Sequence, residues 1–217
     1  MSVRSTRFQL LAGVLATPLF FGVALAQAFT RPGFNLTRHY LSQLSAGEVG
    51  WLQMANFIVT GALYLLCAMA MTRTLSPGRG ATWGPRLIGL FGLGLVAAGL
   101  FSADPANGYP AGTGAEQLTW HGLAHGFAAL GAGLALTAAL FVFAARYLAL
   151  KRIGSAIGAA LVGIVYFVLP WTSADLSSLL LVVASVLGWG WVSLTAWQLA
   201  TRHNAAVERG PLQVQTA

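Results

Sequence analysis

The sequence predicts an all-α integral membrane protein, a bundle of six transmembrane helices with a short amphipathic helix in its first outer loop. Of its 217 residues, 57% are hydrophobic and only 8% are charged. This composition leaves too few polar groups to cover a water-soluble surface. Apolar stretches long enough to cross a bilayer account for most of the length. We therefore expect a single membrane domain over residues 1–217, with no separate soluble domain.

Six apolar segments are expected to form the transmembrane helices. At a rise of about 1.5 Å per residue, each can reach across a hydrocarbon core of roughly 30 Å, the shorter ones with little tilt. The first segment follows Arg4 and Arg7 and contains Pro18, which should kink it. The expected helices cover residues 8–29, 52–72, 86–102, 121–145, 153–169 and 176–199, and a tail follows over residues 200–217.

The first segment has a second interpretation. A basic start, an apolar run and the small residues Ala24-Leu25-Ala26 also describe a cleavable signal peptide. The apolar run is about 22 residues long, however, whereas the apolar region of a signal peptide usually has roughly 7 to 15 residues. We therefore expect this segment to be retained as a transmembrane helix.

The distribution of charge predicts the orientation. All of the 12 Lys and Arg residues except Arg31 and Arg38 lie in alternate connections and at the two ends of the chain, and all of the 5 acids except Glu208 lie on the other side. The positive-inside rule then places both termini in the cytoplasm, and it also explains the net charge of +7 without a nucleic acid partner. The preference for Arg over Lys, with abundant Ala, Gly and Leu, is typical of GC-rich bacterial coding. We expect a multi-pass protein of the bacterial cytoplasmic (inner) membrane.

Two outer connections, residues 30–50 and 103–119, are longer than the inner ones and are the first place to look for function. In the first connection, apolar residues at helical spacing oppose a polar stripe, which predicts a short amphipathic helix capped by Asn35. The second connection is rich in Gly and Pro and should be irregular. The apolar residues are Leu36, Tyr40, Leu41 and Leu44, and the polar stripe is Arg38, Ser42 and Ser45.

Polar residues from several segments are expected to converge at the outer end of the bundle. His121 and His125 share one helical face, about 6 Å apart along the helix axis. Asp104 closes the third segment at the same depth. Asn56 belongs to a polar stripe that should face the interior of the bundle. The stripe consists of Gln53, Asn56 and Thr60, and the expected pocket is lined by Arg38, Ser42, Asn56, Asp104, His121 and His125.

One hypothesis for this pocket is a metal-dependent hydrolase that acts on a membrane-lipid bond. A His-x-x-x-His pair can supply two metal ligands, so Asp104, His121 and His125 are candidate ligands of zinc or another divalent metal. Ser42 or Arg38 would then steady an oxyanion. The arrangement is similar to that of the intramembrane zinc amidohydrolases of the alkaline ceramidase and adiponectin-receptor superfamily, although this chain has six predicted helices and those enzymes have seven. The competing interpretation is structural: Arg38 pairs with Asp104, and the histidines bind loop carbonyls and hold the long loops to the bundle.

The leading functional hypothesis is non-enzymatic and needs no cofactor. The protein would bind a membrane lipid, a partner membrane protein or a second copy of itself through helix faces rich in glycine. The absence of charged residues from the central turns of every segment disfavours ion-coupled transport. The glycines at helix-packing spacing are Gly122 and Gly126 in the fourth segment and Gly154 and Gly158 in the fifth.

Four short motifs occur in order along the chain: Arg31-Pro32-Gly33-Phe34, Leu41-Ser42-Gln43-Leu44, Phe101-Ser102-Ala103-Asp104-Pro105 and His121-Gly122-Leu123-Ala124-His125. Together they resemble domain-of-unknown-function family 998, a family of bacterial and archaeal multi-pass proteins, and the resemblance covers about residues 8–199. It implies six helices and gives prominence to the same outer-face residues. Because that family has no agreed activity, the resemblance favours neither hypothesis over the other.

Overall fold

The computed structural model describes residues 3–75, 77–113 and 118–209, and six long helices make up most of them. Each is long and apolar enough to cross a membrane, α5 together with the 3₁₀ helix η2 (Leu169–Trp171) that continues it. The expected all-α, six-helix architecture is confirmed. The helices are α1 (Val3–Thr30), α2 (Gly50–Thr74), α3 (Trp83–Leu100), α4 (Trp120–Ala149), α5 (Ile153–Val168) and α6 (Ser177–Arg209).

Several helices continue past the apolar segments from which they were predicted. The helix α6 continues to Arg209, although its apolar segment ends at Leu199. The helix α1 already includes Arg4 and Arg7, and it continues through Pro18. Hydrophobicity marks only the part of a helix that matches the hydrocarbon core, whereas backbone hydrogen bonding extends the helix into the polar region on either side.

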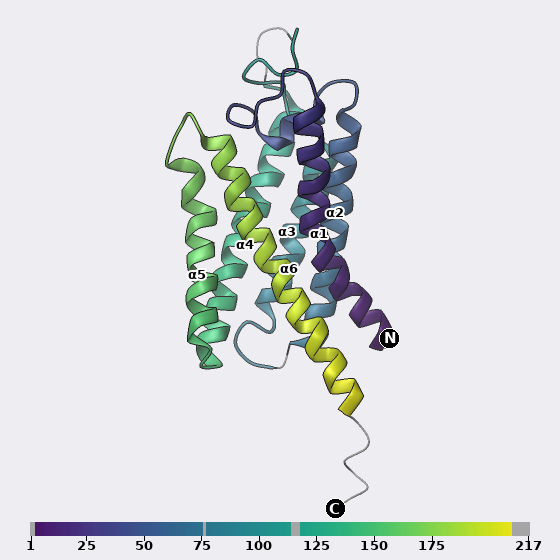
Figure 1. Ribbon diagram of the computed structural model, residues 1–217, viewed down its shortest axis with the longest axis vertical. Coiled ribbons are helices and arrows are strands. Elements are labelled where there is room, and N and C mark those ends of the chain that lie inside the picture. The colour runs from purple at the N-terminus through teal and green to yellow at the C-terminus, as the bar shows by residue number, and fades with distance from the viewer. Residues whose placement is uncertain (1–2, 76, 114–117, 210–217) are drawn as a thin grey trace, which may run out of the picture.

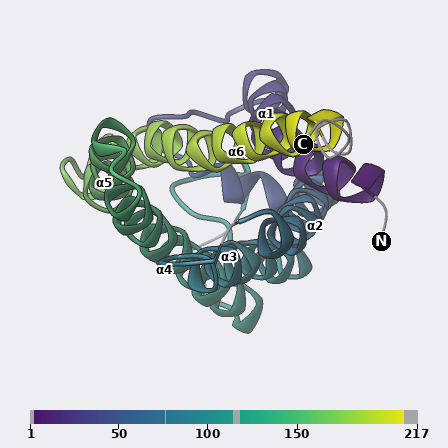
Figure 2. The ribbon, with the colours of Figure 1, turned by 90° about the horizontal axis from the view of Figure 1, so that it is seen from below.

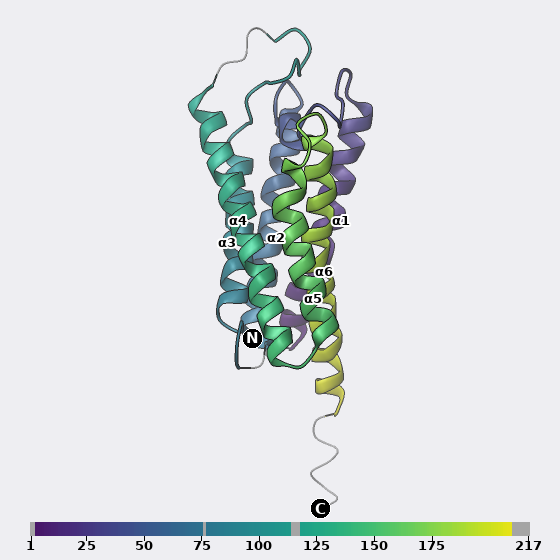
Figure 3. The same ribbon diagram turned by 90° about the vertical axis from the view of Figure 1, so that its left-hand side faces the viewer.

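The helices run along the long axis of the molecule and surround its centre in chain order (Figures 1 and 2). The helix α1 contacts both α2 and α6, which closes the bundle, whereas α6 makes only slight contact with α4. One end of the bundle, which we call the terminal end, is where α1 begins and α6 ends. The opposite end, which we call the loop end, carries the two long connections, before α2 and before α4 (Figure 3).

The packing of α2 against α3 depends on glycine. A Cβ atom on Gly61 would lie 2.5 Å from the carbonyl oxygen of Gly92, and a Cβ atom on Gly92 would lie 2.8 Å from the carbonyl oxygen of Gly61. Further along α3, a Cβ atom on Gly99 would lie 2.7 Å from the carbonyl oxygen of Met54. Only glycine lets two backbones approach this closely, so α2 and α3 pack backbone against backbone.

The glycines expected from their spacing to pack helices do not make the close contacts between the helices. Cβ atoms placed on Gly126, Gly154 or Gly158 would meet nothing within 4 Å, and Gly122 contacts the Asp104 side chain of the preceding connection. Spacing along one helix identifies a face made of small residues. It does not tell whether another helix of the same chain covers that face, because the neighbour's position depends on the whole bundle.

Aromatic rings fill the centre of the bundle. The ring of Trp189 on α6 lies 4.6 Å from that of Phe20 on α1 and 5.2 Å from that of Phe91 on α3, measured between ring centroids. Phe91 in turn lies 4.9 Å from Tyr64 on α2. Such tilted and edge-on pairs stabilise a core beyond the area that they bury. These ring contacts determine which sides of α1, α2, α3 and α6 face the centre of the bundle.

The first long connection does not form the expected amphipathic helix. Asn35 does cap a turn, because its side-chain oxygen accepts hydrogen bonds from the backbone and the hydroxyl of Thr37. The chain then forms the 3₁₀ helix η1 (Leu41–Ser45). Ser45 is buried rather than exposed, since its hydroxyl donates to Ser42 O and accepts from the Ala103 N–H. Of the polar stripe, the Ser45 side chain therefore binds the second connection.

Candidate functional site

The two long connections at the loop end are held together by His39 and Gln43. His39 is buried; its Nδ1 accepts from the Asn35 N–H at 2.9 Å, which leaves Nε2 to donate to the Asn107 carbonyl at 3.1 Å. The amide of Gln43 donates to the Ala106 carbonyl at 2.8 Å. His39 therefore binds a loop carbonyl, as the structural interpretation expected, and both of its ring nitrogens are occupied.

Asp104 binds Thr119, the residue that caps the beginning of α4. Its Oδ2 accepts from the Thr119 N–H at 2.9 Å and its Oδ1 from the Thr119 hydroxyl at 2.6 Å. The same hydroxyl accepts from the Gly122 N–H at 3.1 Å. Gly122 lies directly against the carboxylate, so any side chain at this position would collide with Asp104. A carboxylate is favourable here because the first turn of a helix presents unpaired N–H groups and a partial positive charge.

The two histidines of α4 have different surroundings. His121 is exposed, and its ring stacks on that of Trp120 with 3.7 Å between the centroids. His125 is buried, and its Nδ1 lies 2.8 Å from the Ala98 carbonyl and 3.0 Å from the Phe101 carbonyl. Both partners are acceptors, so Nδ1 carries a proton and donates it to them. His125 thus holds the end of α3 against α4.

The six residues of the expected pocket are distributed over separate surroundings. Asp104 and His121 line an open hollow at the loop end, whereas Ser42 and His125 line a cavity inside the bundle. Arg38 is exposed and lines a third hollow, which also contains Asp175. Asn56 is buried between α1 and α2, and its amide donates to the Phe20 carbonyl at 3.0 Å.

This distribution does not support a metal site made by Asp104, His121 and His125. Within the part of the chain that the structure describes, no group of three or more His, Cys, Asp or Glu side chains is placed to hold a metal ion. The reason that these side chains do not converge is that each is held by a different part of the backbone. The Asp104 carboxylate is drawn to the first turn of α4, while the Nδ1–H of His125 is drawn to carbonyls at the end of α3.

The cavity that contains Ser42 and His125 is the strongest candidate for a ligand site. It has a volume of about 140 Å³ and lies between α1, α3, α4 and α6. Its walls are mainly apolar. From Ser178 to Trp189, its lining extends about 16 Å along α6. The lining residues that carry polar side-chain groups are Tyr40, Ser42, His125, Tyr166, Ser178, Ser185 and Trp189.

Trp189 brings a buried donor to this cavity. Its ring is 5% exposed, and its Nε1–H finds no partner at hydrogen-bond geometry among the described residues, although the Tyr166 hydroxyl lies near enough to interact with it. A buried donor without a partner costs on the order of 1 to 3 kcal/mol, so such groups are rare unless a ligand or water satisfies them. Ser185 on the same helix is 8% exposed and also lines the cavity.

A groove on the outside of the bundle borders this cavity. The groove has a volume of about 480 Å³, lies between α4, α5 and α6, and shares Tyr40, Ala129, Gly133, Tyr166 and Leu181 with the lining of the cavity. It exists because α6 makes only slight contact with α4 and because α4 carries small residues here. The surfaces of these helices beside the groove are apolar, as surfaces in contact with lipid must be.

Tyr166, Ser185 and Trp189 were not among the residues predicted from the sequence. A signal for Trp189 was present. Tryptophan in transmembrane helices is enriched near the membrane surface, whereas Trp189 lies in the middle of a predicted span between Gly188 and Gly190. Gly188 lets the Tyr166 ring approach α6, because a Cβ atom there would lie 2.8 Å from Tyr166 Cδ2. Tyr166 and Ser185 carry no comparable signal.

Comparison with known proteins agrees with the resemblance seen in the motifs. The model of the family described as "Protein of unknown function (DUF998)" matches residues 14–198. The chain belongs to this family. It is a multi-pass membrane protein of the DUF998 family, and every residue that lines the cavity or the groove lies within the matched range. No curated protein and no solved structure matches it. The function of this DUF998 member therefore has to be argued from its own cavity.

Proposed function

We propose that this DUF998 protein binds an amphiphilic membrane lipid inside its helix bundle. The observation that carries the proposal is the buried Nε1–H of Trp189, which makes no hydrogen bond of normal geometry among the described residues and lies in a cavity that shares lining residues with a groove on the outside of the bundle. A ligand that fits must be mainly apolar and must carry at least one acceptor oxygen, as lipid esters and carbonyl-containing lipids do.

The structure of the loop end favours entry of a lipid into the cavity from the membrane rather than from water. His39 and Gln43 bind the two long connections together across this end, and Tyr109 of the second connection packs on the first with its ring 5.3 Å from that of His39. The groove between α4 and α6, in contrast, is bordered by apolar helix surfaces. A lipid can therefore slide into the groove from the surrounding leaflet without leaving an apolar environment.

Filling the groove tests the proposal. A Cβ atom on Gly133 would have only Tyr166 Oη within 4 Å, at 3.7 Å, so Gly133→Leu places its branched end in the groove without a backbone collision. We expect the wild-type protein, purified in a mild detergent, to carry lipid that native mass spectrometry resolves. In Gly133→Leu, the fraction of protein that carries lipid should fall severalfold.

Gly131→Leu is the matched control for this experiment. Gly131 lies on the same helix, a Cβ atom on it would meet nothing within 4 Å, and it lines neither the cavity nor the groove. Its lipid occupancy should equal that of the wild type. Equal occupancy in Gly133→Leu and Gly131→Leu, or a wild-type protein without bound lipid, would count against the proposal.

The hydrolase alternative draws no support from the side-chain geometry, because Asp104 and His125 use their polar atoms to hold α3 and α4 together. Elemental analysis of the purified protein tests it directly. Stoichiometric zinc or another transition metal that is lost in His121→Ala would favour the hydrolase. His121 is the appropriate choice because it is exposed and its removal breaks no buried contact.

Binding of a second copy or of a partner membrane protein also stays a proposal, and one observation favours it. Cβ atoms on Gly154 and Gly158 of α5 would meet nothing within 4 Å, so this face of small residues is open. Gly158→Leu should leave the folded chain intact and reduce cross-linking between copies or with co-purified proteins. Unchanged cross-linking would exclude this face as the interface.

A further inference from the structure

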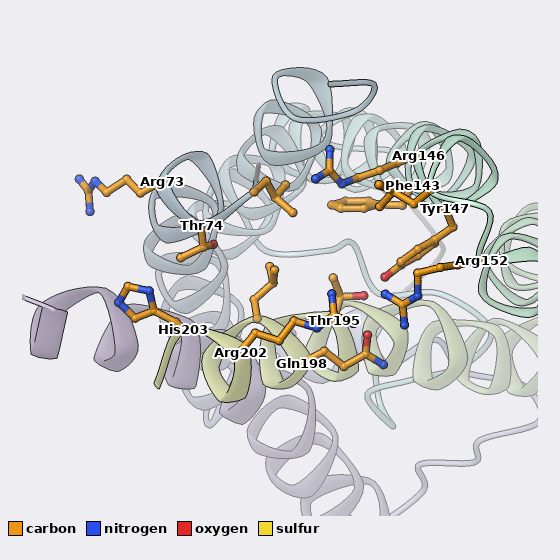
Figure 4. A pocket seen from close by; sticks show the side chains of 13 residues that line it. Arg73, Thr74, Phe143, Arg146, Tyr147, Arg152, Thr195, Gln198, Arg202 and His203 are labelled. Carbon is orange, nitrogen blue, oxygen red and sulfur yellow. The ribbon is translucent and has the colours of Figure 1, made fainter. Parts of the chain in front are cut away.

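A second cavity, larger than the first, lies at the terminal end of the bundle. It has a volume of about 560 Å³, within the usual range of ligand pockets, and it is lined by residues of α2, α4 and α6 and of the turn between α4 and α5 (Figure 4). It shares no lining residue with the cavity that contains Trp189. Its occupant must therefore be considered separately.

Arginine dominates the polar lining of this cavity. The arginines are Arg73, Arg146, Arg152 and Arg202, and none of the described lining residues is acidic. Neutral hydrogen-bonding groups of Thr195 and Gln198 lie among them. Cations gathered around one hollow repel one another, and an anion bound between them would remove that repulsion.

Local structure fixes two of these arginines at the cavity. Arg146 is only 6% exposed, and its guanidinium donates to the Arg79 carbonyl at 2.9 Å. Arg152 is half-buried, with its guanidinium carbon 5.2 Å from the centre of the Tyr147 ring. The tight turn between α4 and α5 brings Arg152 back toward α4, since its N–H donates to the Tyr147 carbonyl at 2.8 Å.

The side chains differ in where they point. Figure 4 shows Arg152 and Arg202 extending toward the space beside Thr195 and Gln198, whereas Arg73 points away from it. Arg73 donates instead to the Gln9 side chain of α1 at 2.9 Å. The centre of the site is therefore formed by Arg152 and Arg202 with the neutral polar groups of α6.

An independent feature of the same cavity is the imidazole of His203. Its Nε2 is buried and has no hydrogen-bond partner among the described residues. Buried polar atoms without a hydrogen-bond partner are uncommon in folded proteins. A ligand or a water that reaches Nε2 would supply the missing hydrogen bond. The cavity thus has both excess positive charge and an unused hydrogen-bonding group.

The positive-inside rule explains why arginines occur at this end, but it does not explain their convergence. Arg86 shows the difference. It lies at the same end, is exposed, and rests over the Trp83 ring with 5.5 Å between the guanidinium carbon and the ring centre. A residue needed only for orientation can point to the surface in this way, whereas Arg146 and Arg152 are held at the wall of a hollow.

We infer that this cavity binds a phosphate-bearing anion between Arg152 and Arg202. Arginine matches phosphate because its planar guanidinium can donate two parallel hydrogen bonds to two oxygens. Thr195 and Gln198 supply the neutral donors that complete such a site. The phosphate belongs either to a lipid headgroup at the membrane surface or to a soluble phosphorylated molecule, and both present the same chemistry to the cavity.

Two probes distinguish these sources, and both use the full chain in a phosphate-free maltoside detergent. In the first measurement, inorganic pyrophosphate is titrated by calorimetry. In the second, phosphatidylglycerol is titrated by native mass spectrometry, with diacylglycerol as the lipid that lacks phosphate. Saturable pyrophosphate binding indicates a soluble ligand, and preference for phosphatidylglycerol over diacylglycerol indicates a headgroup. Either result supports the inference if it depends on the arginines of the cavity.

The variants that establish this dependence are Arg152→Gln and Arg202→Gln, with Arg86→Gln as the control that removes the same charge at the same end. We expect each cavity variant to weaken the observed binding about tenfold or more, because a charge-assisted hydrogen bond is lost. Arg86→Gln should bind like the wild type. Arg152→Lys should recover only part of the affinity, since lysine cannot donate the paired hydrogen bonds.

Two outcomes would overturn the inference. One is a wild-type protein that binds neither pyrophosphate nor phosphatidylglycerol in preference to diacylglycerol. The other is equal weakening in Arg86→Gln, which would show that binding follows only the overall charge of this end. Size-exclusion profiles of the variants identify any that has lost its fold, and a wild-type protein that binds neither probe overturns the inference without them.

Discussion

Gly61 on α2 and Gly92 on α3 lie back to back, each occupying the space that a Cβ atom of the other would need. Gly61→Ala should therefore push the two helices apart and lower stability by about 1 to 3 kcal/mol, the usual cost of overpacking. Thermal unfolding in detergent measures the effect. Gly89→Ala on α3 is the control, because a Cβ atom there would lie 3.7 Å from that of Ala68, an ordinary contact. It should be neutral or slightly stabilising, and an equal loss in both variants would contradict the prediction.

His39 holds the two long connections together, so His39→Ala should loosen them. The substitution leaves the Asn35 N–H and the Asn107 carbonyl without their partner, at a cost of about 1 to 3 kcal/mol. We expect faster cleavage by added protease within residues 105–113. His121→Ala removes an exposed imidazole that stacks on Trp120 and should be cleaved at the wild-type rate. If the connections are equally resistant in both variants, His39 does not hold them.

Asp104 and Gly122 should be coupled energetically. Gly122→Ala displaces the Asp104 carboxylate from the first turn of α4 and should cost about 0.5 to 2 kcal/mol, the value of a helix cap. In an Asp104→Ala background there is no carboxylate to displace, so the same change should be neutral or favourable. A double-mutant cycle of unfolding free energies measures the difference. Simple additivity of the two changes would show that the contact has no energetic weight.

Trp189→Phe should affect lipid binding more than folding. In the lipid-free protein the substitution removes only the contact of the Nε1–H with the Tyr166 hydroxyl and keeps an aromatic ring among Phe20 and Phe91, so we expect a loss of about 1 to 2 kcal/mol, mainly from reduced packing. Affinity for the bound lipid should fall about tenfold, as a buried hydrogen bond is lost. Trp191→Phe, whose ring packs on Phe143 outside the cavity, should leave that affinity unchanged. Equal affinities in the two variants would remove Trp189 from the site.

The sequence predicted the helices well because their existence depends on a one-dimensional property, the length of each apolar stretch. It also predicted which side of α2 faces inward: Gln53, Asn56 and Thr60 are 0%, 6% and 0% exposed. Both predictions rest on spacing within one helix. Neither needs the position of a neighbouring helix.

The candidate site was harder to predict because it depends on how each helix is rotated and how far it is shifted along its neighbour. His121 and His125 differ by only about 40° around the axis of α4. They also lie about one helical turn apart along that axis. Together these two differences place His121 at the surface and His125 against the end of α3. The pairing of Gly61 with Gly92 likewise depends on relative depth, which no residue type reveals. Trp189 was not predicted either, although it carried a signal that does not depend on helix rotation, since a tryptophan far from the membrane surface is unusual.

The groove between α4 and α6 also determines how occupancy of the cavity would be controlled. A molecule that enters sideways equilibrates with the two-dimensional pool of its own leaflet, so the relevant quantity is its mole fraction in the bilayer and not its aqueous concentration. Dilution of vesicles in buffer should then leave the site filled, whereas dilution of the bilayer with a foreign lipid should empty it.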